Sequence, residues 1–152
     1  MENRTLQAKP DARTEGLVVQ ELSDEVLDRI FAINLRGTHV ACAAFGAAMV
    51  TRRRGSIVNI GSVAGSYPYP GGNVYGATKA FVEQLSLNLR ADLVARNIRV
   101  TSVEPGMVET EFSEVRFGGD KERARAVYRG MQPLSGDDIA DCIHYAVTRP
   151  PH

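Results

Sequence analysis

The order of two apolar runs and the helical segments around them most limits the fold of this chain. Residues 56–62 read SIVNIGS and are apolar on both sides, which suits a strand buried in a parallel sheet. A helical pattern follows over residues 73–96, and IRVTSVEPG at 98–106 predicts a second strand that Pro105 ends. Strand, helix and strand in this order form a βαβ unit with parallel strands and a right-handed crossover. The sequence therefore predicts an α/β fold on a parallel sheet.

A long helix is predicted before the first strand, over residues 24–53. Ser23 is a suitable N-cap, and Asp24 and Glu25 fall in the positive first turn. Apolar and small residues recur at helical spacing and predict one apolar stripe, formed by Val26, Ile30, Ile33, Gly37, Val40, Ala44 and Ala48. The many alanines and glycines would let a sheet or another helix approach closely.

The remaining segments are shorter. The first 20 residues are expected to form an irregular leader, in which GLVVQ at 16–20 could make a short strand. Residues 105–120 are read as a polar loop and 121–130 as a short helix. Ser135 opens a last helix and forms a capping-box pattern with Asp138. The buried sides of the two later long helices are predicted to be Phe81, Val82, Leu85, Leu89 and Leu93, and then Ile139, Ile143, Ala146 and Val147.

Composition excludes several classes of protein. The 152 residues carry 18 basic and 18 acidic side chains, whereas a nucleic-acid-binding protein would be expected to be basic. No apolar run approaches the ~20 residues that span a bilayer, and the first residues lack the apolar stretch of a secretory signal. Cys42 and Cys142 lie in apolar helical contexts and are predicted to be buried thiols, and the 3 histidines are too scattered for a metal site. A cytoplasmic protein without a membrane, nucleic-acid or metal partner is expected.

The stretch from Gly61 to Lys79 carries the chemistry. Tyr75 and Lys79 are four residues apart, so a helix places them on one face, one turn apart. A free tyrosine titrates near ~10, and a nearby ammonium favours the phenolate and brings the pKa toward neutral pH. Ser62, from the end of the preceding strand, can hydrogen-bond the substrate oxygen that Tyr75 protonates. The spacing alone also fits an ordinary surface pair.

Four motifs in order extend this pattern: INLRG at 33–37, IVNIGSVAG at 57–65, YGATK at 75–79 and VEPGMVETEF at 103–112. Together they resemble the short-chain dehydrogenase/reductase family. GGNVYGATKAF at 71–81 and EPGMVETEFSEVRF at 104–117 are most similar to its NADP-dependent 3-hydroxy acid dehydrogenases, which include serine and L-allo-threonine dehydrogenases. The resemblance spans residues 21–149, the C-terminal part of the family's Rossmann domain.

The resemblance implies a role for each matching residue. Tyr75 is the general acid/base, Lys79 lowers its pKa and binds the nicotinamide ribose, and Ser62 orients the substrate. Asn34 holds a water that links Lys79 to solvent. The cofactor would meet the loop after the second strand, through Pro105, Gly106, Val108 and Thr110. Arg116 is a candidate for clamping a substrate carboxylate, with a solvated surface arginine as the alternative.

The family's glycine-rich phosphate-binding turn has no counterpart in the sequence. The predicted fold is therefore a partial Rossmann-like, doubly wound parallel sheet that lacks the N-terminal nucleotide-binding half, and NADP is favoured over NAD by resemblance alone. Two functions remain open. The chain is an oxidoreductase that moves hydride between NADP and a small 3-hydroxy acid, or it is a shortened, inactive relative that acts as an association module. In either case a homo-oligomer is expected, through the helices at 24–53 and 73–96.

Overall fold

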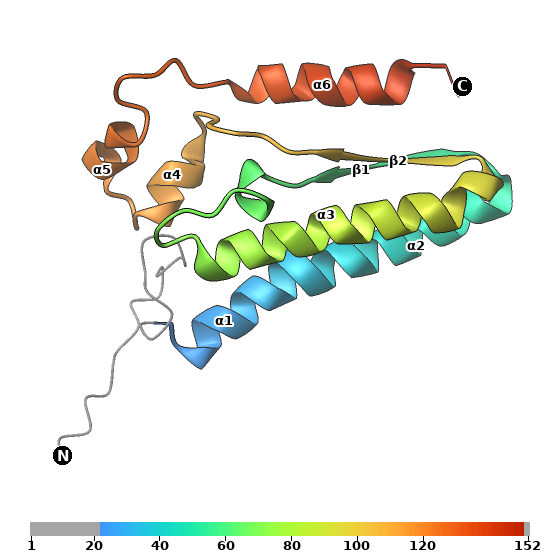
Figure 1. The fold of residues 1–152 in the computed structure, drawn as a ribbon, viewed down its shortest axis with the longest axis horizontal. Helices are drawn as coiled ribbons and strands as arrows, with labels where there is room; N and C mark the ends of the chain where they lie inside the picture. Colours follow the sequence, from blue (N-terminus) through green and yellow to red (C-terminus); the bar gives the residue numbers. More distant parts are fainter. Residues whose placement is uncertain (1–21, 151–152) are drawn as a thin grey trace.

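A two-stranded parallel sheet lies between a layer of two long helices and a single helix on its other face (Figure 1). The computed structural model describes residues 22–150. The elements in chain order are α1 Asp24–Ile30, the π-helical η2 Phe31–Gly37, α2 Thr38–Arg52, β1 Gly55–Ile60, the 3₁₀ turn η3 Val63–Gly65, α3 Asn73–Leu93, the 3₁₀ turn η4 Val94–Arg96, β2 Ile98–Val103, α4 Glu111–Arg116, α5 Lys121–Ala126 and α6 Gly136–Thr148. The predicted α/β fold is confirmed, and the leader and short strand predicted within residues 1–20 lie outside the described residues.

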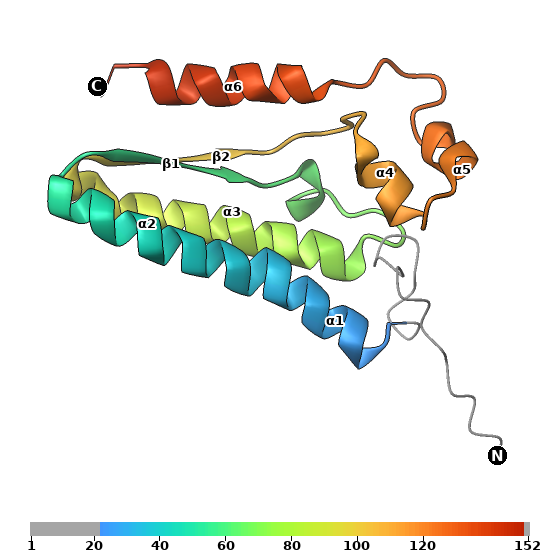
Figure 2. The ribbon, with the colours of Figure 1, turned by 180° about the vertical axis from the view of Figure 1, so that it is seen from behind.

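The strands β1 and β2 pair in parallel register, from Gly55 with Ile98 to Ile60 with Val103. Alternate residues point to opposite faces, so Ile57, Ile98 and Val100 lie on the face that α2 and α3 cover. Figure 2 shows the two helices side by side below the sheet, with α6 above it. A small core forms there, because Cys42 of α2 and the half-buried leucines of α3 pack on the same strands.

The buried strip between the helices and β1 is partly polar, which the sequence pattern did not predict. Asn59 of β1 donates from Nδ2 to Ser86 Oγ of α3 at 2.9 Å. The Ser86 hydroxyl donates a hydrogen bond to the Val82 carbonyl oxygen at 2.7 Å, and the Cys42 thiol lies 3.5 Å from Asn59 Oδ1. Asn59, Ser86 and Cys42 are therefore paired with one another, and the chain of bonds ties β1 to both helices.

The first helical region differs from the prediction in two ways. It is continuous along the chain but contains the π-helical η2 between α1 and α2. The predicted apolar stripe is also not the buried side, because Ile33 and Val40 are 63% and 54% exposed, whereas Cys42 and Gly46 are buried. A helix rich in alanine is apolar on more than one side, so periodicity could not tell which side meets the sheet.

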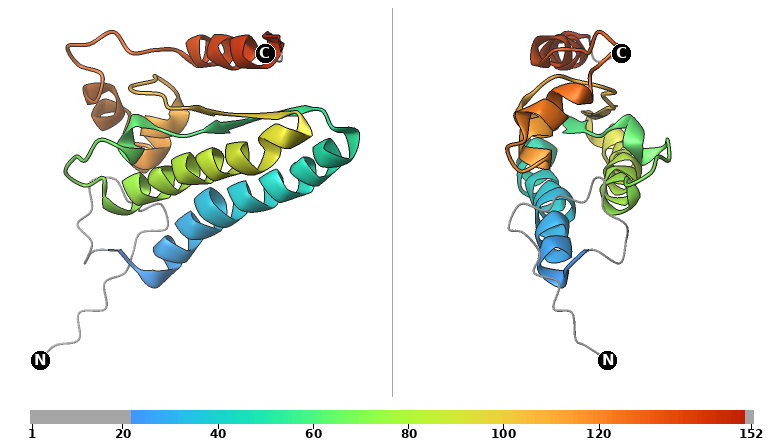
Figure 3. Two further views of the ribbon diagram at one scale, coloured as in Figure 1. Left: turned by 45° about the vertical axis from the view of Figure 1, so that its right-hand side comes forward. Right: turned by 90° about the vertical axis from the view of Figure 1, so that its left-hand side faces the viewer.

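Helix α6 lies on the opposite face of the sheet, as the end-on view of Figure 3 shows. Its capping box is formed as predicted: Ser135 Oγ accepts from Asp138 N, and Asp138 Oδ2 accepts from Ser135 N. At the other end Arg99 of β2 donates to the Val147 and Arg149 carbonyls, which have no partner within the helix. These bonds fix α6 along the strands.

The predicted buried side of α6 is only partly correct. Ile139, Ile143 and Ala146 are half-buried, but Val147 is 41% exposed. Cys142, predicted to be buried, is exposed. A sheet of two strands is narrow, so it covers only the line of α6 residues that points directly at it.

The region after β2 also departs from the prediction. The expected loop at 105–120 contains the short helix α4, and the expected helix at 121–130 ends at Ala126. Both helices lie at the end of the sheet where β1 and β2 have their carboxyl ends, next to η3 and the start of α3 (Figure 1). Within residues 22–150 no helix is long and apolar enough to cross a membrane.

Candidate active site

Ser62, Tyr75 and Lys79 come from consecutive segments at the carboxyl end of β1. Ser62 follows the strand in an extended conformation and caps η3, accepting from Ala64 N at 3.1 Å. Tyr75 and Lys79 lie in the first two turns of α3, which packs against η3. The Lys79 ammonium is 5.7 Å from the centre of the Tyr75 ring. The structure thus brings the predicted phenol and ammonium together.

Lys79 is held by the strand as well as by its own helix. Its Nζ donates to the Ile60 carbonyl at 3.0 Å. Burial lowers the pKa of Lys79 below its ordinary value, since desolvation disfavours the charged form. An ammonium fixed beside a phenol ring and partly removed from water interacts with it more strongly than one in bulk solvent.

Two glycines allow η3 and α3 to approach this closely. A Cβ on Gly76 would lie 2.8 Å from the Ala64 carbonyl oxygen, and one on Gly65 would lie 2.9 Å from the Lys79 carbonyl carbon. Neither glycine has a positive φ, so the requirement is space rather than backbone conformation. The contact sets the spacing between the segment that carries Ser62 and the helix that carries Tyr75.

Asn34 lies in the π-helical η2, which packs against α3. Its Nδ2 donates to Thr78 Oγ1 at 3.0 Å, and its backbone carbonyl accepts from Thr38 Oγ1 at 2.8 Å. π-Helical turns inside α-helices are frequent at functional sites. Asn34 therefore contacts the helix that carries Tyr75 and Lys79, and it does so through Thr78, the residue before Lys79.

The loop after β2 lies beside η3. The Pro105 carbonyl accepts from Val63 N at 3.1 Å, which joins the segments that follow the two strands. A Cβ on Gly106 would meet nothing within 4 Å, so this side of the loop is open. Val108 bridges to Leu134, and its carbonyl accepts from the Tyr128 hydroxyl at 2.9 Å.

Thr110 and Arg116 are at the two ends of α4. Thr110 caps the helix, with Oγ1 accepting from Phe112 N at 3.2 Å. The hydroxyl proton of Thr110 can still be donated elsewhere. Arg116 is the last residue of α4, and its side chain lies outside what the structure describes.

Two residues near the site were missed in the sequence. The Phe112 ring lies 5.9 Å from the Tyr75 ring, tilted by 42°, so α4 packs directly beside the phenol. No signal pointed to this contact because α4 is too short to show a period. Thr78 is the other, and its helical spacing to Val82 and Ser86 could have indicated a buried side.

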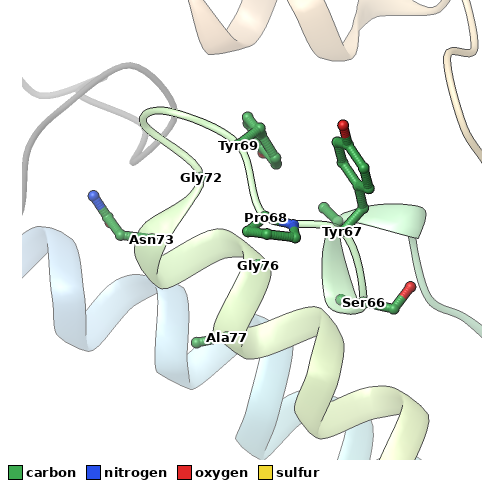
Figure 4. A pocket seen from close by; sticks show the side chains of 10 residues that line it. Ser66, Tyr67, Pro68, Tyr69, Gly72, Asn73, Gly76 and Ala77 are labelled. Atoms are coloured by element: carbon green, nitrogen blue, oxygen red, sulfur yellow. The ribbon is translucent and has the colours of Figure 1, made fainter.

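A pocket of about 240 Å³ lies between the loop at 66–72 and the start of α3 (Figure 4). Tyr67, Pro68, Tyr69 and Asn73 line it, together with Gly76 and Ala77. Its lining does not include Ser62, Tyr75 or Lys79, because Asn73, Gly76 and Ala77 share a different side of the helix. The pocket is therefore next to the candidate residues Tyr75 and Lys79 and does not contain them.

Among residues 22–150 no group of His, Cys, Asp or Glu could hold a metal ion. The residues described above offer hydroxyl, phenol, amide and ammonium groups. A serine hydroxyl that follows β1, and a phenol and an ammonium on the helix that packs against η3, are residue types suited to proton transfer at an alcohol or carbonyl.

The profile of the short chain dehydrogenase family matches residues 12–119, and so begins earlier than the resemblance drawn from the motifs. The chain belongs to the short-chain dehydrogenase family. It is 57% identical over 105 residues to an NADP-dependent 3-hydroxy acid dehydrogenase of Salmonella typhi, covering 68% of this chain and 42% of that protein. It is 50% identical over 120 residues to sulfoacetaldehyde reductase 2 of Chromohalobacter salexigens, covering 78% and 48%.

The fold is shared with solved structures of the same family. A closed form of serine dehydrogenase complexed with NADP+ superposes with a TM-score of 0.86 at 45% identity, over 91% of this chain and 56% of that one. The chain thus spans about half the length of the relatives that it matches. The predicted partial Rossmann-like fold agrees with this comparison.

Proposed function

We propose that this chain carries the catalytic residues of an NADP-dependent oxidoreductase that moves hydride between the cofactor and a small 3-hydroxy acid. The observation that supports this most is the Lys79 ammonium 5.7 Å from the Tyr75 ring, on a helix that packs against η3, the turn that Ser62 caps after β1. Each of these residue types has a distinct task in alcohol oxidation and carbonyl reduction. The chain belongs to a family of dehydrogenases, and membership of this family also supports the proposal.

In the proposed reaction Tyr75 accepts the proton of the substrate hydroxyl on oxidation and returns it on reduction. Lys79 favours the phenolate of Tyr75 by its charge, which brings the proton affinity toward neutral pH. Ser62 donates a hydrogen bond to the same substrate oxygen and so holds the reacting carbon in place. Asn34 holds a water that connects Lys79 with solvent. Through this path Tyr75 regains its starting protonation state after each turnover.

The residues fit the nicotinamide and ribose end of NADP. Lys79 is a desolvated ammonium with a hydroxyl-bearing tyrosine beside it, and the loop from Pro105 to Thr110 has its open side at Gly106. We assign ribose binding to Tyr75 and Lys79, and contacts with the nicotinamide and phosphates to Pro105, Gly106, Val108 and Thr110. The cofactor supplies the hydride acceptor or donor. A glycine-rich turn for the pyrophosphate is not among the 152 residues.

The substrate class is proposed from the chemistry that the named relatives share. A 3-hydroxy acid and sulfoacetaldehyde both carry an anionic group one carbon away from the reacting carbon. Arg116 is our candidate for binding this group, because a guanidinium pairs with a carboxylate through two parallel hydrogen bonds. Assays with L-serine, 3-hydroxypropionate and isethionate distinguish the carboxylate from the sulfonate.

A second function is supported by the surface of the helices. Ile33, Val40 and Phe45 are 63%, 54% and 67% exposed, although their helix otherwise packs on the sheet. Among the described residues β1 also pairs with β2 alone, so its other edge has no strand beside it. Apolar helix faces and open strand edges promote association. These surfaces favour an association module as the second function, and for either function we propose a homo-oligomer formed through the helices at 24–53 and 73–96.

Titration of the full 152-residue chain with NADPH, followed by cofactor fluorescence with NADH in parallel, tests the proposal. Saturable binding in the micromolar range supports the oxidoreductase. Binding that is absent at millimolar cofactor, in a chain that is folded and associated by circular dichroism and sedimentation, supports the association module instead.

The same proposal predicts the effect of Tyr75→Phe. This variant should lose turnover while it keeps the far-ultraviolet spectrum, since the reacting hydroxyl is removed. Its NADPH affinity should fall no more than a few-fold, because the one lost hydrogen bond to the ribose is worth about 1 kcal/mol. Tyr67→Phe is a matched control, because Tyr67 is 71% exposed and lies outside the proposed machinery. A Tyr75→Phe chain with unaltered turnover would contradict the mechanism.

A further inference from the structure

Thr78 is the most deeply buried side chain of the first turns of α3 and has no role in the reaction described above. Only 1% of its surface is exposed. It lies where α3 packs against η2, between Tyr75 and Lys79 in the sequence. A hydroxyl buried to this degree must be satisfied within the protein or it destabilises the fold.

The hydroxyl of Thr78 makes two hydrogen bonds of opposite sense. It lies 2.8 Å from the Tyr75 carbonyl oxygen, one turn earlier in the helix. It also lies 3.0 Å from Asn34 Nδ2, which is 44 residues away in the sequence. A carbonyl oxygen can only accept, so the Thr78 hydroxyl donates its one hydrogen bond to the backbone carbonyl of Tyr75. The Thr78 oxygen then accepts from Asn34 Nδ2.

This arrangement decides which end of the Asn34 amide faces α3. The NH₂ end is the only one that can bond to a hydroxyl whose proton is already donated. The opposite orientation would place two acceptors against each other. The amide oxygen of Asn34 is therefore kept as an acceptor for another partner.

We propose that Thr78 is a positioning residue that sets the orientation of the Asn34 amide and couples it to the backbone of Tyr75. This inference rests on the proposed function for its consequence, since Asn34 is there the link between Lys79 and solvent. In this view a buried hydroxyl joins the π-helical η2 to the helix that carries Tyr75 and Lys79, within the packing of these two elements. Loss of the hydroxyl should impair proton exchange with solvent more than substrate binding.

The test uses the full chain with Thr78→Val, which keeps the shape but removes the hydroxyl, and Thr78→Ser, which keeps the hydroxyl. In asparagine-labelled protein the Asn34 side-chain amide protons should shift and exchange faster in Thr78→Val and stay unaltered in Thr78→Ser. If the chain turns over, kcat of Thr78→Val should fall by about ten- to a hundredfold with KM unaltered. The solvent deuterium isotope effect on kcat should rise in Thr78→Val alone.

Each arm has an outcome that overturns the inference. Asn34 amide signals that are the same in Thr78→Val and in the unaltered chain would refute the positioning role, as would a Thr78→Ser chain that behaves like Thr78→Val. If Thr78→Val does not fold, nuclear Overhauser contacts between the Asn34 amide protons and the Thr78 methyl group in the unaltered chain decide, and their absence refutes the inference. A chain that shows no turnover refutes the proposed function, while the amide signals still test Thr78.

Discussion

The close contact between η3 and α3 makes Gly76→Ala an informative perturbation. The new methyl group would lie 2.8 Å from the Ala64 carbonyl oxygen, a backbone atom that cannot rotate away. Contacts of this kind are relieved only by moving η3 or α3, and such overpacking typically costs about 1–3 kcal/mol. Alanine gains about 1 kcal/mol over glycine within a helix. The free energy of unfolding should therefore fall by about 0–2 kcal/mol.

Gly46→Ala is the matched control for this variant. Gly46 is also in the interior of a helix, but its added Cβ would lie 4.0 Å from Ile57 Cδ1, an ordinary contact. The Gly46→Ala variant should gain only the higher helix propensity of alanine, and so its free energy of unfolding should rise by about 1 kcal/mol. The difference between the two variants, about 1–3 kcal/mol, isolates the cost of the contact.

Urea unfolding of both variants, followed by far-ultraviolet circular dichroism, gives the two free energies of unfolding. In an active chain Gly76→Ala should also lower kcat, because a displaced η3 moves Ser62 away from Tyr75. Equal stabilisation by the two substitutions would refute the argument that Gly76 is required for space. A destabilised Gly76→Ala chain with unaltered kcat would show that the contact stabilises the fold without positioning Ser62.

Three further predictions follow from the described contacts. Ser135→Ala removes the cap of α6 and should lower the free energy of unfolding by about 1 kcal/mol in the same urea experiment. Because burial lowers the pKa of Lys79, the unfolded chain binds that proton more tightly, and stability should rise with pH from the lowered pKa up to the ordinary value of 10.5. Lys79→Met should remove this rise, as measured by unfolding at a series of pH values. Val40→Asp with Phe45→Asp should reduce self-association in sedimentation equilibrium, whereas Tyr67→Ser, on a separate exposed loop, should not.

Segments with strong local signals were predicted well. The strand expected at 56–62 is β1 at Gly55–Ile60, and the helix expected at 73–96 is α3 with the turn η4 after it. The capping box of Ser135 and Asp138 is formed. Each of these features depends on residues within a few positions of one another, so the pattern in the chain contains the information that sets them.

Features that depend on packing were predicted poorly. Helix α4 was read as loop because six residues show no helical period. The buried side of α2 was misassigned because its alanines make several sides equally apolar, and Cys142 was expected inside although the narrow sheet leaves it exposed. In these cases the neighbouring elements decide which residues are covered.

The same division holds for the site. The sequence by itself determined the chemistry that is present, since the spacing of Tyr75 and Lys79 on a helix and the place of Ser62 after a strand are local properties. Only the tertiary structure decided how these groups are held. The bond between Asn34 and Thr78 and the contact of Gly76 with Ala64 join separate elements, and such contacts form only when the helices pack on the sheet.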